Sequence, residues 1–174
     1  MTDWKTRPET DQDVPAVRRV VEAAFPTSEE ADLVDALRKD AAWLPGLSWV
    51  AESPDGQVAG YALLTRCQIG NGDTDRGADA LALAPVAVLP EYQRQGAGGA
   101  AVRAALEAAR EQGERLVVVL GHPDYYPKFG FGRASAMGIR TSFEVPDEAL
   151  MALVLGGSGP VPAGTIRYAA PFGV

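Results

Sequence analysis

Three glycines lie close together in the segment "QRQGAGGAAVRAALEAAR" (residues 93–110), where a long amphipathic helix should begin. Glycine disfavours helix formation, so its clustering at a helix start indicates that another group approaches the backbone closely. The first turn of a helix leaves main-chain N–H groups without partners, and the helix dipole adds positive potential there. Gly96, Gly98 and Gly99 therefore predict a phosphate-binding site.

Other interpretations of these glycines are weaker or stay open. They also permit tight packing of the helix on a sheet. The letters "GAGGAA" (96–101) match the dinucleotide fingerprint G-x-G-x-x-A, which indicates a nicotinamide-dependent oxidoreductase. That fingerprint opens the first strand–turn–helix unit of a chain and is followed by a ribose-binding acid, whereas here the unit begins near residue 80 and no such acid follows. No Lys-Ser or Lys-Thr follows the glycines, which excludes a P-loop.

The other chemically active side chains are few. With one histidine (His122), one cysteine (Cys67) and no ligand spacing, no metal site is predicted. Cys67 falls on an expected strand and is interpreted as a small core residue. A single cysteine excludes an intramolecular disulfide and fits a reducing compartment. The N-terminus "MTDWKTRPET" lacks the apolar run of a signal peptide, and no segment is long enough to span a membrane, so we expect a cytoplasmic location and no membrane partner.

The composition predicts one folded domain over residues 1–174. The chain is 47% hydrophobic and 22% charged, which suffices for a buried core. Its formal net charge of −7 argues against nucleic acid as a partner, because phosphate contacts need clustered Lys and Arg.

The elements that must position the glycines alternate between strands and helices, with a strand–helix–strand crossover in the middle, which predicts an α+β fold. Thr10 and Asp13 form a capping-box pair, and Ser28 is the expected cap of the second helix. The charged outer faces of the first two helices, including Arg18, Asp35 and Arg38, are interpreted as solvated surface. The expected strands are residues 3–9, 47–53, 58–69, 80–90, 115–121, 138–145 and 164–170; the expected helices are residues 10–25, 29–39, 96–112 and 146–153; residues 70–79 form a loop.

Around the glycines, "VAVLPEYQRQGAGGAAV" (86–102) resembles motif A of the GCN5-related N-acetyltransferase (GNAT) family, with the signature at residues 93–98. "YYPKFGF" (125–131) is similar to motif B, a short helix ending in Gly-Phe. Three segments resemble the YhbS-like branch of the family: "LGHPDYYPKFGF", "VPDEALMAL" and "GTIRY". The resemblance implies the GNAT acyl-CoA N-acyltransferase fold: a mixed, mostly antiparallel central sheet flanked by helices, with splayed central strands.

The resemblance also implies acetyl-CoA as co-substrate, without a metal. Main-chain groups of residues 86–88 would bind the pantetheine arm, and an N–H group of Val88 would stabilise the oxyanion. The N–H groups of residues 94–99 would hold the pyrophosphate, with help from the Arg94 side chain. The implied cofactor-binding residues are thus Val86, Ala87, Val88, Arg94, Gln95, Gly96, Ala97, Gly98 and Gly99.

Tyr126 is the implied catalytic residue, a general acid that protonates the departing thiolate. Its alternative role is packing against the cofactor, which is the role expected for Tyr125. Many relatives carry a glutamate as general base on the strand before motif A, but this chain has no acid between Asp79 and Glu91. The base must come from elsewhere, and the candidates are Glu29, Glu30, Asp32, His122 or a water chain.

The sequence thus predicts an acetyl-CoA-dependent N-acetyltransferase that acts on a primary amine by direct attack. The acceptor is a small molecule or a peptide; Trp43, Leu44 and Pro45, in the loop expected after the second helix, either wall the acceptor pocket or pack in the core. Because the usual base is missing, a non-catalytic acyl-CoA-binding or sensory module is the alternative. A homodimer is compatible with the sequence.

The phosphate site makes a first prediction. Gly98→Glu places bulk and negative charge where the pyrophosphate should lie, and we expect it to abolish acetyl-CoA binding measured by isothermal titration. Thermal unfolding of the variant checks that the fold survives. Retained affinity in a folded variant would contradict the proposed position of the site.

Overall fold

The computed structural model describes residues 4–71 and 77–174, and the chain divides into two compact units. The first unit comprises Met1–Leu64 and Ala84–Ala108, and the second comprises Thr65–Leu83 and Ala109–Val174. Strands β3 (Val58–Gly70) and β4 (Ala78–Val88) and helix α3 (Ala97–Glu111) contribute residues to both units. This division does not test the expected single domain, which stays a prediction.

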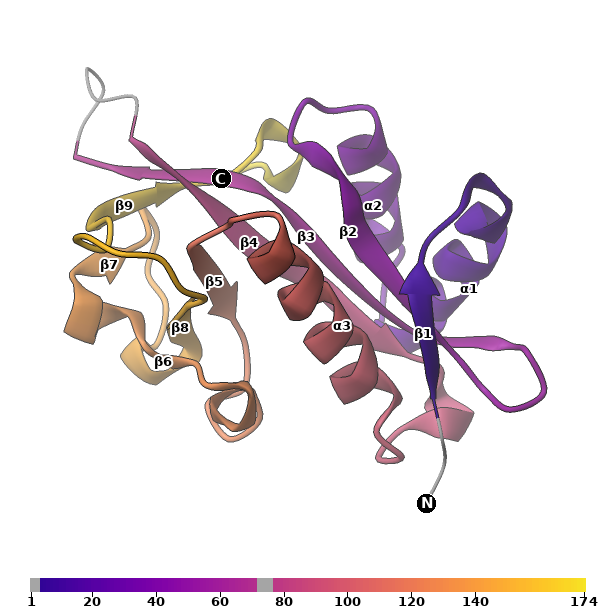
Figure 1. Ribbon diagram of the computed structural model, residues 1–174. Helices are drawn as coiled ribbons and strands as arrows, with labels where there is room; N and C mark the ends of the chain where they lie inside the picture. The colour runs from indigo at the N-terminus through magenta and orange to yellow at the C-terminus, as the bar shows by residue number, and fades with distance from the viewer. Residues whose placement is uncertain (1–3, 72–76) are drawn as a thin grey trace. The chain divides into compact units, whose positions relative to one another are not determined.

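The predicted α+β class is confirmed, because the strands form a mixed, mostly antiparallel sheet accompanied by helices (Figure 1). Across the described residues, hydrogen bonds connect the strands in the order β1-β2-β3-β4-β5-β8-β6, and β9 pairs with β3 and β7. The predicted crossover is present as β4–α3–β5, since β4 and β5 run parallel, with Leu81 opposite Val117 and Ala82 opposite Val118. The remaining strands are β1 (Lys5–Pro8), β2 (Trp43–Glu52), β5 (Leu116–Leu120), β6 (Gly132–Arg133), β7 (Ile139–Arg140), β8 (Leu150–Val154) and β9 (Gly164–Arg167).

In the first unit, helices cover both faces of β3. Successive side chains of a strand point to opposite faces. Gly60 faces the start of α3, because a Cβ atom at this glycine would lie 3.1 Å from the carbonyl oxygen of Ala97. The next residue, Tyr61, points to the opposite face and is fully buried, and the charges of Asp35 and Arg38 in α2 (Glu29–Arg38) act on its hydroxyl. Helix α1 (Val14–Ala24) packs beside α2 and buries Val17, Val20 and Val21, as the helical spacing predicts.

The capping box at the start of the first helical segment is confirmed. The N–H of Thr10 donates to a carboxylate oxygen of Asp13 at 2.7 Å, although residues 11–13 form a 3₁₀ turn before α1 begins. Arg7 also binds this carboxylate and, with the Thr10 bonds, holds the pKa of Asp13 at about 2. The Asp13 pKa is lowered by folding, so its stabilising contribution is present above its ordinary pKa of 3.8 and is lost as the pH falls toward 2. Ser28 precedes α2 but does not cap it by a side-chain hydrogen bond.

The second unit has its own apolar core. Cys67, Ile69, Val118, Ile139 and Ala152 contribute to one cluster of buried side chains drawn from six strands, β3, β4, β5, β7, β8 and β9. At its edge, Arg66 makes a two-pronged ion pair with Glu114, with bonds of 2.7 and 2.8 Å. Cys67 is therefore a core residue, as predicted.

Two expectations for the last third of the chain were wrong in detail. The helix expected over 146–153 is a short 3₁₀ turn, Asp147–Ala149, followed by strand β8, which pairs antiparallel with β5 along its whole length. A short apolar run such as "LMALV" fits a helix or a strand, and pairing with β5 decides for the strand. The strand expected over 138–145 is limited to β7, Ile139–Arg140.

The loop expected over 70–79 is shorter than predicted. Strand β3 ends at Gly70 and β4 begins at Ala78, and residues 72–76 lie outside the described residues.

The close approach of β3 to α3 makes a stability prediction. Gly60→Ala places a methyl group 3.1–3.2 Å from backbone and Cβ atoms of Ala97, so we expect a loss of about 1 kcal/mol in the free energy of unfolding. Urea unfolding measures it. Gly132→Ala is the matched control, since an added Cβ there meets no heavy atom within 4 Å and should be nearly neutral. Equal midpoints for the two variants would contradict the packing.

Candidate functional site

The glycine-rich turn, residues 94–99, lies between the end of β4 and the first turn of α3, as predicted. After β4 the chain forms a 3₁₀ turn, Pro90–Tyr92, and α3 begins at Ala97. The backbone φ angle is +63° at Arg94 and +92° at Gly96. A positive φ is strained for a residue with a side chain, and Arg94 is the one non-glycine residue of the described chain that adopts it. Residues with positive φ can turn neighbouring N–H groups toward one side, as they do in anion-binding nests.

The beginning of α3 supplies further N–H groups. A main-chain bond of 2.9 Å from the Ala100 N–H to the Gly96 carbonyl starts the helix. The N–H groups of residues 96–99 therefore precede the repeating bonds of the helix and have no partner within it. Arg94, Gln95 and Gly96 are exposed, whereas Ala97, Gly98 and Gly99 are buried. Helix α3 is long enough for its dipole to favour an anion at this end.

The alternative explanation of the glycines, close helix–sheet packing, also has a counterpart in the structure. Gly60 of β3 faces Ala97, and the absence of a side chain at Gly60 allows this contact. Sequence analysis missed Gly60, because a lone glycine inside a strand gives no signal of its partner. The approach of α3 to β3 is thus explained by a glycine outside the cluster.

Val86, Ala87 and Val88 form the end of β4, in the same unit as the glycine-rich turn. Ala87 is buried, while Val86 and Val88 are half-buried. The next residue, Leu89, donates its N–H to the Ala59 carbonyl of β3 at 2.9 Å, which fixes the end of β4. The Gln93 side-chain amide reaches back to the Val88 carbonyl at 3.4 Å. All nine predicted cofactor-binding residues therefore belong to the first unit.

Tyr126 belongs to the second unit and begins the 3₁₀ helix Tyr126–Phe129, the expected motif B helix, which ends in a left-handed Gly130. Its side chain is 9% exposed and packs edge-on against Tyr125 and Phe131. Gly121 leaves the space that the ring occupies. Burial raises the pKa of Tyr126 to about 12, so its hydroxyl keeps its proton at neutral pH. Within the described residues no group hydrogen-bonds this hydroxyl, which leaves it available to a bound molecule.

The candidate bases differ in environment. Glu29 and His122 are exposed, and Asp32 is 64% exposed and pairs with Arg18 at 2.9 Å. Glu30, in the first turn of α2, differs from them because its Oε2 atom is buried and has no hydrogen-bond partner among residues 4–71 and 77–174. A buried carboxylate oxygen without a partner is costly, and it is a feature that sequence analysis could not reveal.

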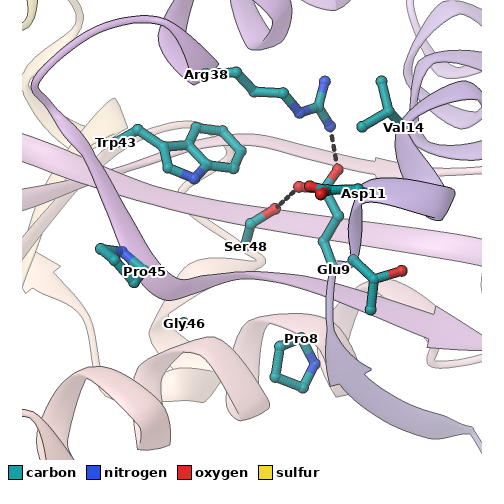
Figure 2. Close-up of a pocket in the computed structure, with 10 residues that line it drawn as sticks. Pro8, Glu9, Asp11, Val14, Arg38, Trp43, Pro45, Gly46 and Ser48 are labelled. Carbon is teal, nitrogen blue, oxygen red and sulfur yellow. Dashed lines mark hydrogen bonds and ion pairs between the residues drawn. The ribbon is translucent and has the colours of Figure 1, made fainter.

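A polar pocket of about 370 Å³ lies in the first unit, where β1 ends and β2 begins (Figure 2). Trp43 and Pro45 line it, but as part of β2 and not in a loop after α2, which corrects the sequence expectation. The strand was expected to begin later because Pro and Gly usually interrupt strands. In the structure Pro45 and Gly46 lie within β2, before the part of the strand that pairs with β1. The pocket lining is Pro8, Glu9, Thr10, Asp11, Val14, Arg38, Trp43, Pro45, Gly46 and Ser48.

A buried carboxylate forms the floor of this pocket. The Glu9 side chain is 5% exposed, and its two oxygens bind the Arg38 guanidinium and, at 2.9 Å, the Ser48 hydroxyl (Figure 2). Ser48 also shares a hydrogen bond of 2.7 Å with the Tyr61 hydroxyl, and burial raises the pKa of Tyr61 above its ordinary value. Arg38 lies over the Trp43 ring at 5.4 Å. The sequence analysis interpreted Arg38 as solvated surface, and this was wrong. Arg38 is a partly buried partner of Glu9.

The described residues contain no group of three or more His, Cys, Asp or Glu side chains arranged to hold a metal ion. No helix among them is long and apolar enough to cross a membrane. Burial raises the pKa of the Cys67 thiol to about 12, so this thiol is a poor nucleophile.

Comparison with known proteins agrees with these features. Residues 14–131 match the model of the acetyltransferase (GNAT) family. The chain is 39% identical over 137 residues to the uncharacterized N-acetyltransferase YjhQ of Escherichia coli K12, covering 78% of this chain and 74% of YjhQ. It is 33% identical over 134 residues to the uncharacterized N-acetyltransferase YhbS of the same organism, covering 77% of each.

Two crystal structures have a similar fold. The GNAT family N-acetyltransferase YhbS from E. coli, in complex with CoA, has a TM-score of 0.86 at 27% identity, covering 100% of this chain and 94% of that one. A GNAT family acetyltransferase from Brucella melitensis, in complex with acetyl-CoA, has a TM-score of 0.77 at 34% identity, covering 98% of each chain. The chain belongs to the acetyltransferase (GNAT) family. The predicted YhbS-like acetyltransferase class and GNAT fold are confirmed.

Proposed function

We propose that this protein transfers the acetyl group of acetyl-CoA to a primary amine by direct attack. The observation that carries the proposal is the turn at residues 94–99, where two positive φ angles and the first turn of α3 present a series of main-chain N–H groups. The two similar crystal structures contain CoA and acetyl-CoA, which supports the same ligand here. The cytoplasmic location and the homodimer stay predictions.

The pyrophosphate would accept hydrogen bonds from the N–H groups of residues 94–99, with the helix dipole adding favourable potential. The exposed Arg94 side chain would supply a positive charge. The pantetheine arm would run along the main chain of Val86, Ala87 and Val88, as an added strand does along a sheet edge.

The reaction forms a C–N bond and breaks a C–S bond. The amine nitrogen attacks the thioester carbon and loses a proton, and the Val88 N–H stabilises the oxyanion of the tetrahedral intermediate. The intermediate collapses by expelling the CoA thiolate, which takes the proton of the Tyr126 hydroxyl. The proton lost by the amine later restores Tyr126 through solvent. An acetyl-cysteine intermediate on Cys67 is disfavoured because that thiol is buried and has a raised pKa.

Glu30 is the base that we propose for the amine. An alkylammonium has a pKa near 10.4, so it must lose a proton before it can attack at neutral pH. Glu30 has one buried carboxylate oxygen whose lone pairs no described residue occupies, which suits a proton acceptor for an amine or a bridging water. Glu29, Asp32 and His122 are more exposed, and Asp32 is also paired with Arg18.

For the acceptor we propose a small molecule or peptide with a second positive charge. The pocket of Figure 2 contains Asp11 in addition to the neutral Glu9–Arg38 pair, so its lining carries a net negative charge. Trp43, Pro8 and Pro45 provide apolar surface for an alkyl chain. Diamines should therefore have a lower KM than monoamines of equal length.

Isothermal titration with acetyl-CoA, followed by thiol release across a panel of monoamines, diamines and peptides, tests the proposal. Binding with turnover is the expected result. Absence of acetyl-CoA binding would overturn the proposal. Binding without turnover on any amine would favour the alternative, a non-catalytic acyl-CoA-binding or sensory module.

Tyr126→Phe tests the general acid. Losing the hydroxyl should lower kcat by about 100-fold and leave the Kd for acetyl-CoA unchanged, because the ring still packs. Since the pKa of Tyr126 is about 12, its proton stays in place as the pH rises, and the wild-type rate should not fall between pH 8 and about pH 10 on its account. Thiol-release assays measure kcat of the variant and the pH dependence of the wild-type rate. An unchanged kcat would leave Tyr126 with a packing role.

Glu30→Gln tests the base, with Glu29→Gln as the matched control on the adjacent, exposed residue. We expect Glu30→Gln to lower kcat at pH 7 by about 100-fold, because the amide cannot accept the proton. The loss should shrink at high pH, where more of the amine is already deprotonated. Equal rates for the two variants would show that Glu30 is not the base.

A further inference from the structure

The side chain of Trp4 contacts the glycine-rich turn from a distant part of the sequence. Its indole N–H donates to the Gln95 carbonyl at 2.8 Å. A Cβ atom at Gly96 would lie 3.7 Å from the same indole nitrogen, so the ring lies against this glycine. The indole also stacks edge-on against Tyr92, with ring centroids 5.5 Å apart. Tyr92 in turn donates its hydroxyl to the Gln57 side chain at 3.2 Å.

The bond to Gln95 fixes the direction of a neighbouring donor. A trans peptide unit is planar and points its C=O and N–H to opposite sides. Because the Gln95 carbonyl points at Trp4, the N–H of Gly96, in the same peptide unit, points away from Trp4. This N–H is one of the groups proposed to hold the pyrophosphate.

The Gln95–Gly96 peptide unit needs a hydrogen bond of this kind to hold its orientation. Arg94 and Gly96 both have positive φ, and an exposed turn of this kind has other conformations of similar energy. If the Gln95–Gly96 peptide rotated, its carbonyl oxygen would face the phosphate in place of the N–H and would repel it. Within residues 4–71 and 77–174, the other bonds of Gln95 and Gly96 are a side-chain bond from Gln95 to the Glu91 carbonyl and the first bond of α3, and neither holds the Gln95 carbonyl.

We infer that Trp4 is a positioning residue for the coenzyme A pyrophosphate: its indole N–H holds the Gln95 carbonyl and so keeps the Gly96 N–H directed at the phosphate. This inference rests on the proposed function. It assigns a role in cofactor binding to a residue that precedes the first strand and lies outside both sequence motifs. Trp4 touches no reacting atom, so its effect should be on affinity and not on the chemical step.

Trp4→Phe removes the indole N–H and keeps an aromatic ring beside Tyr92. Trp49→Phe is the matched control, since Trp49 also donates its indole N–H to a carbonyl, that of Gly46, at 2.8 Å. Loss of one hydrogen bond of ordinary strength should raise the Kd for acetyl-CoA about fivefold in Trp4→Phe. Trp49→Phe should bind as the wild type does, and kcat at saturating acetyl-CoA should be unchanged in Trp4→Phe.

A second measurement needs no ligand. In an amide NMR spectrum of the ¹⁵N-labelled free protein, the Gly96 resonance should move in Trp4→Phe and stay in place in Trp49→Phe. If the wild type fails to bind acetyl-CoA, the proposed function is wrong, while this resonance still reports on the Trp4 bond. If the wild type binds and Trp4→Phe binds equally well, or loses kcat as well as affinity, the positioning role is wrong.

Discussion

The proposed activity depends on one constraint, the direction of a few main-chain N–H groups where β4 passes into α3. Backbone donors bind an anion only if they converge, and convergence here requires positive φ angles at Arg94 and Gly96. Glycine adopts such an angle freely, whereas Arg94 does so at a cost. A strained residue persists where its surroundings determine its conformation. The contacts around the turn are therefore as important as the glycines within it.

Three contacts, made by two segments remote in sequence, restrain this turn. Gly60 of β3 lets Ala97 approach, the Ala59 carbonyl holds Leu89 at the end of β4, and Trp4 holds Gln95. Each contact acts on a different part of the chain between Val88 and Ala97, so together they limit how the turn can move. None of the three resembles a catalytic motif, yet each acts on the residues that would bind the cofactor.

The sequence predicted the part of the fold that depends on local patterns. The capping pair Thr10–Asp13 and the crossover around α3 follow from residue types and spacing, and the resemblance to motif B implied the short helix that ends at Gly130. It failed where long-range pairing decides, as in β8, whose apolar letters fit a helix equally well. It also missed partnerships: nothing in the sequence indicates that Arg38 neutralises Glu9, or that Trp4 reaches Gln95 across 91 positions.

Hydrogen-bond partners distinguish Asp13 and Glu9, which have structural roles, from Glu30, the proposed base. Asp13 binds Arg7 and Thr10, which lower its pKa to about 2, so it is a very weak base. Glu9 is more deeply buried, but Arg38 and Ser48 occupy its two oxygens, and it serves to join β1, α2 and β2. Glu30 keeps a buried oxygen that no described residue occupies. The missing acid on β4 thus does not exclude the proposed reaction, because Glu30 of α2, which we propose as the base, is a carboxylate with an oxygen that no described residue binds.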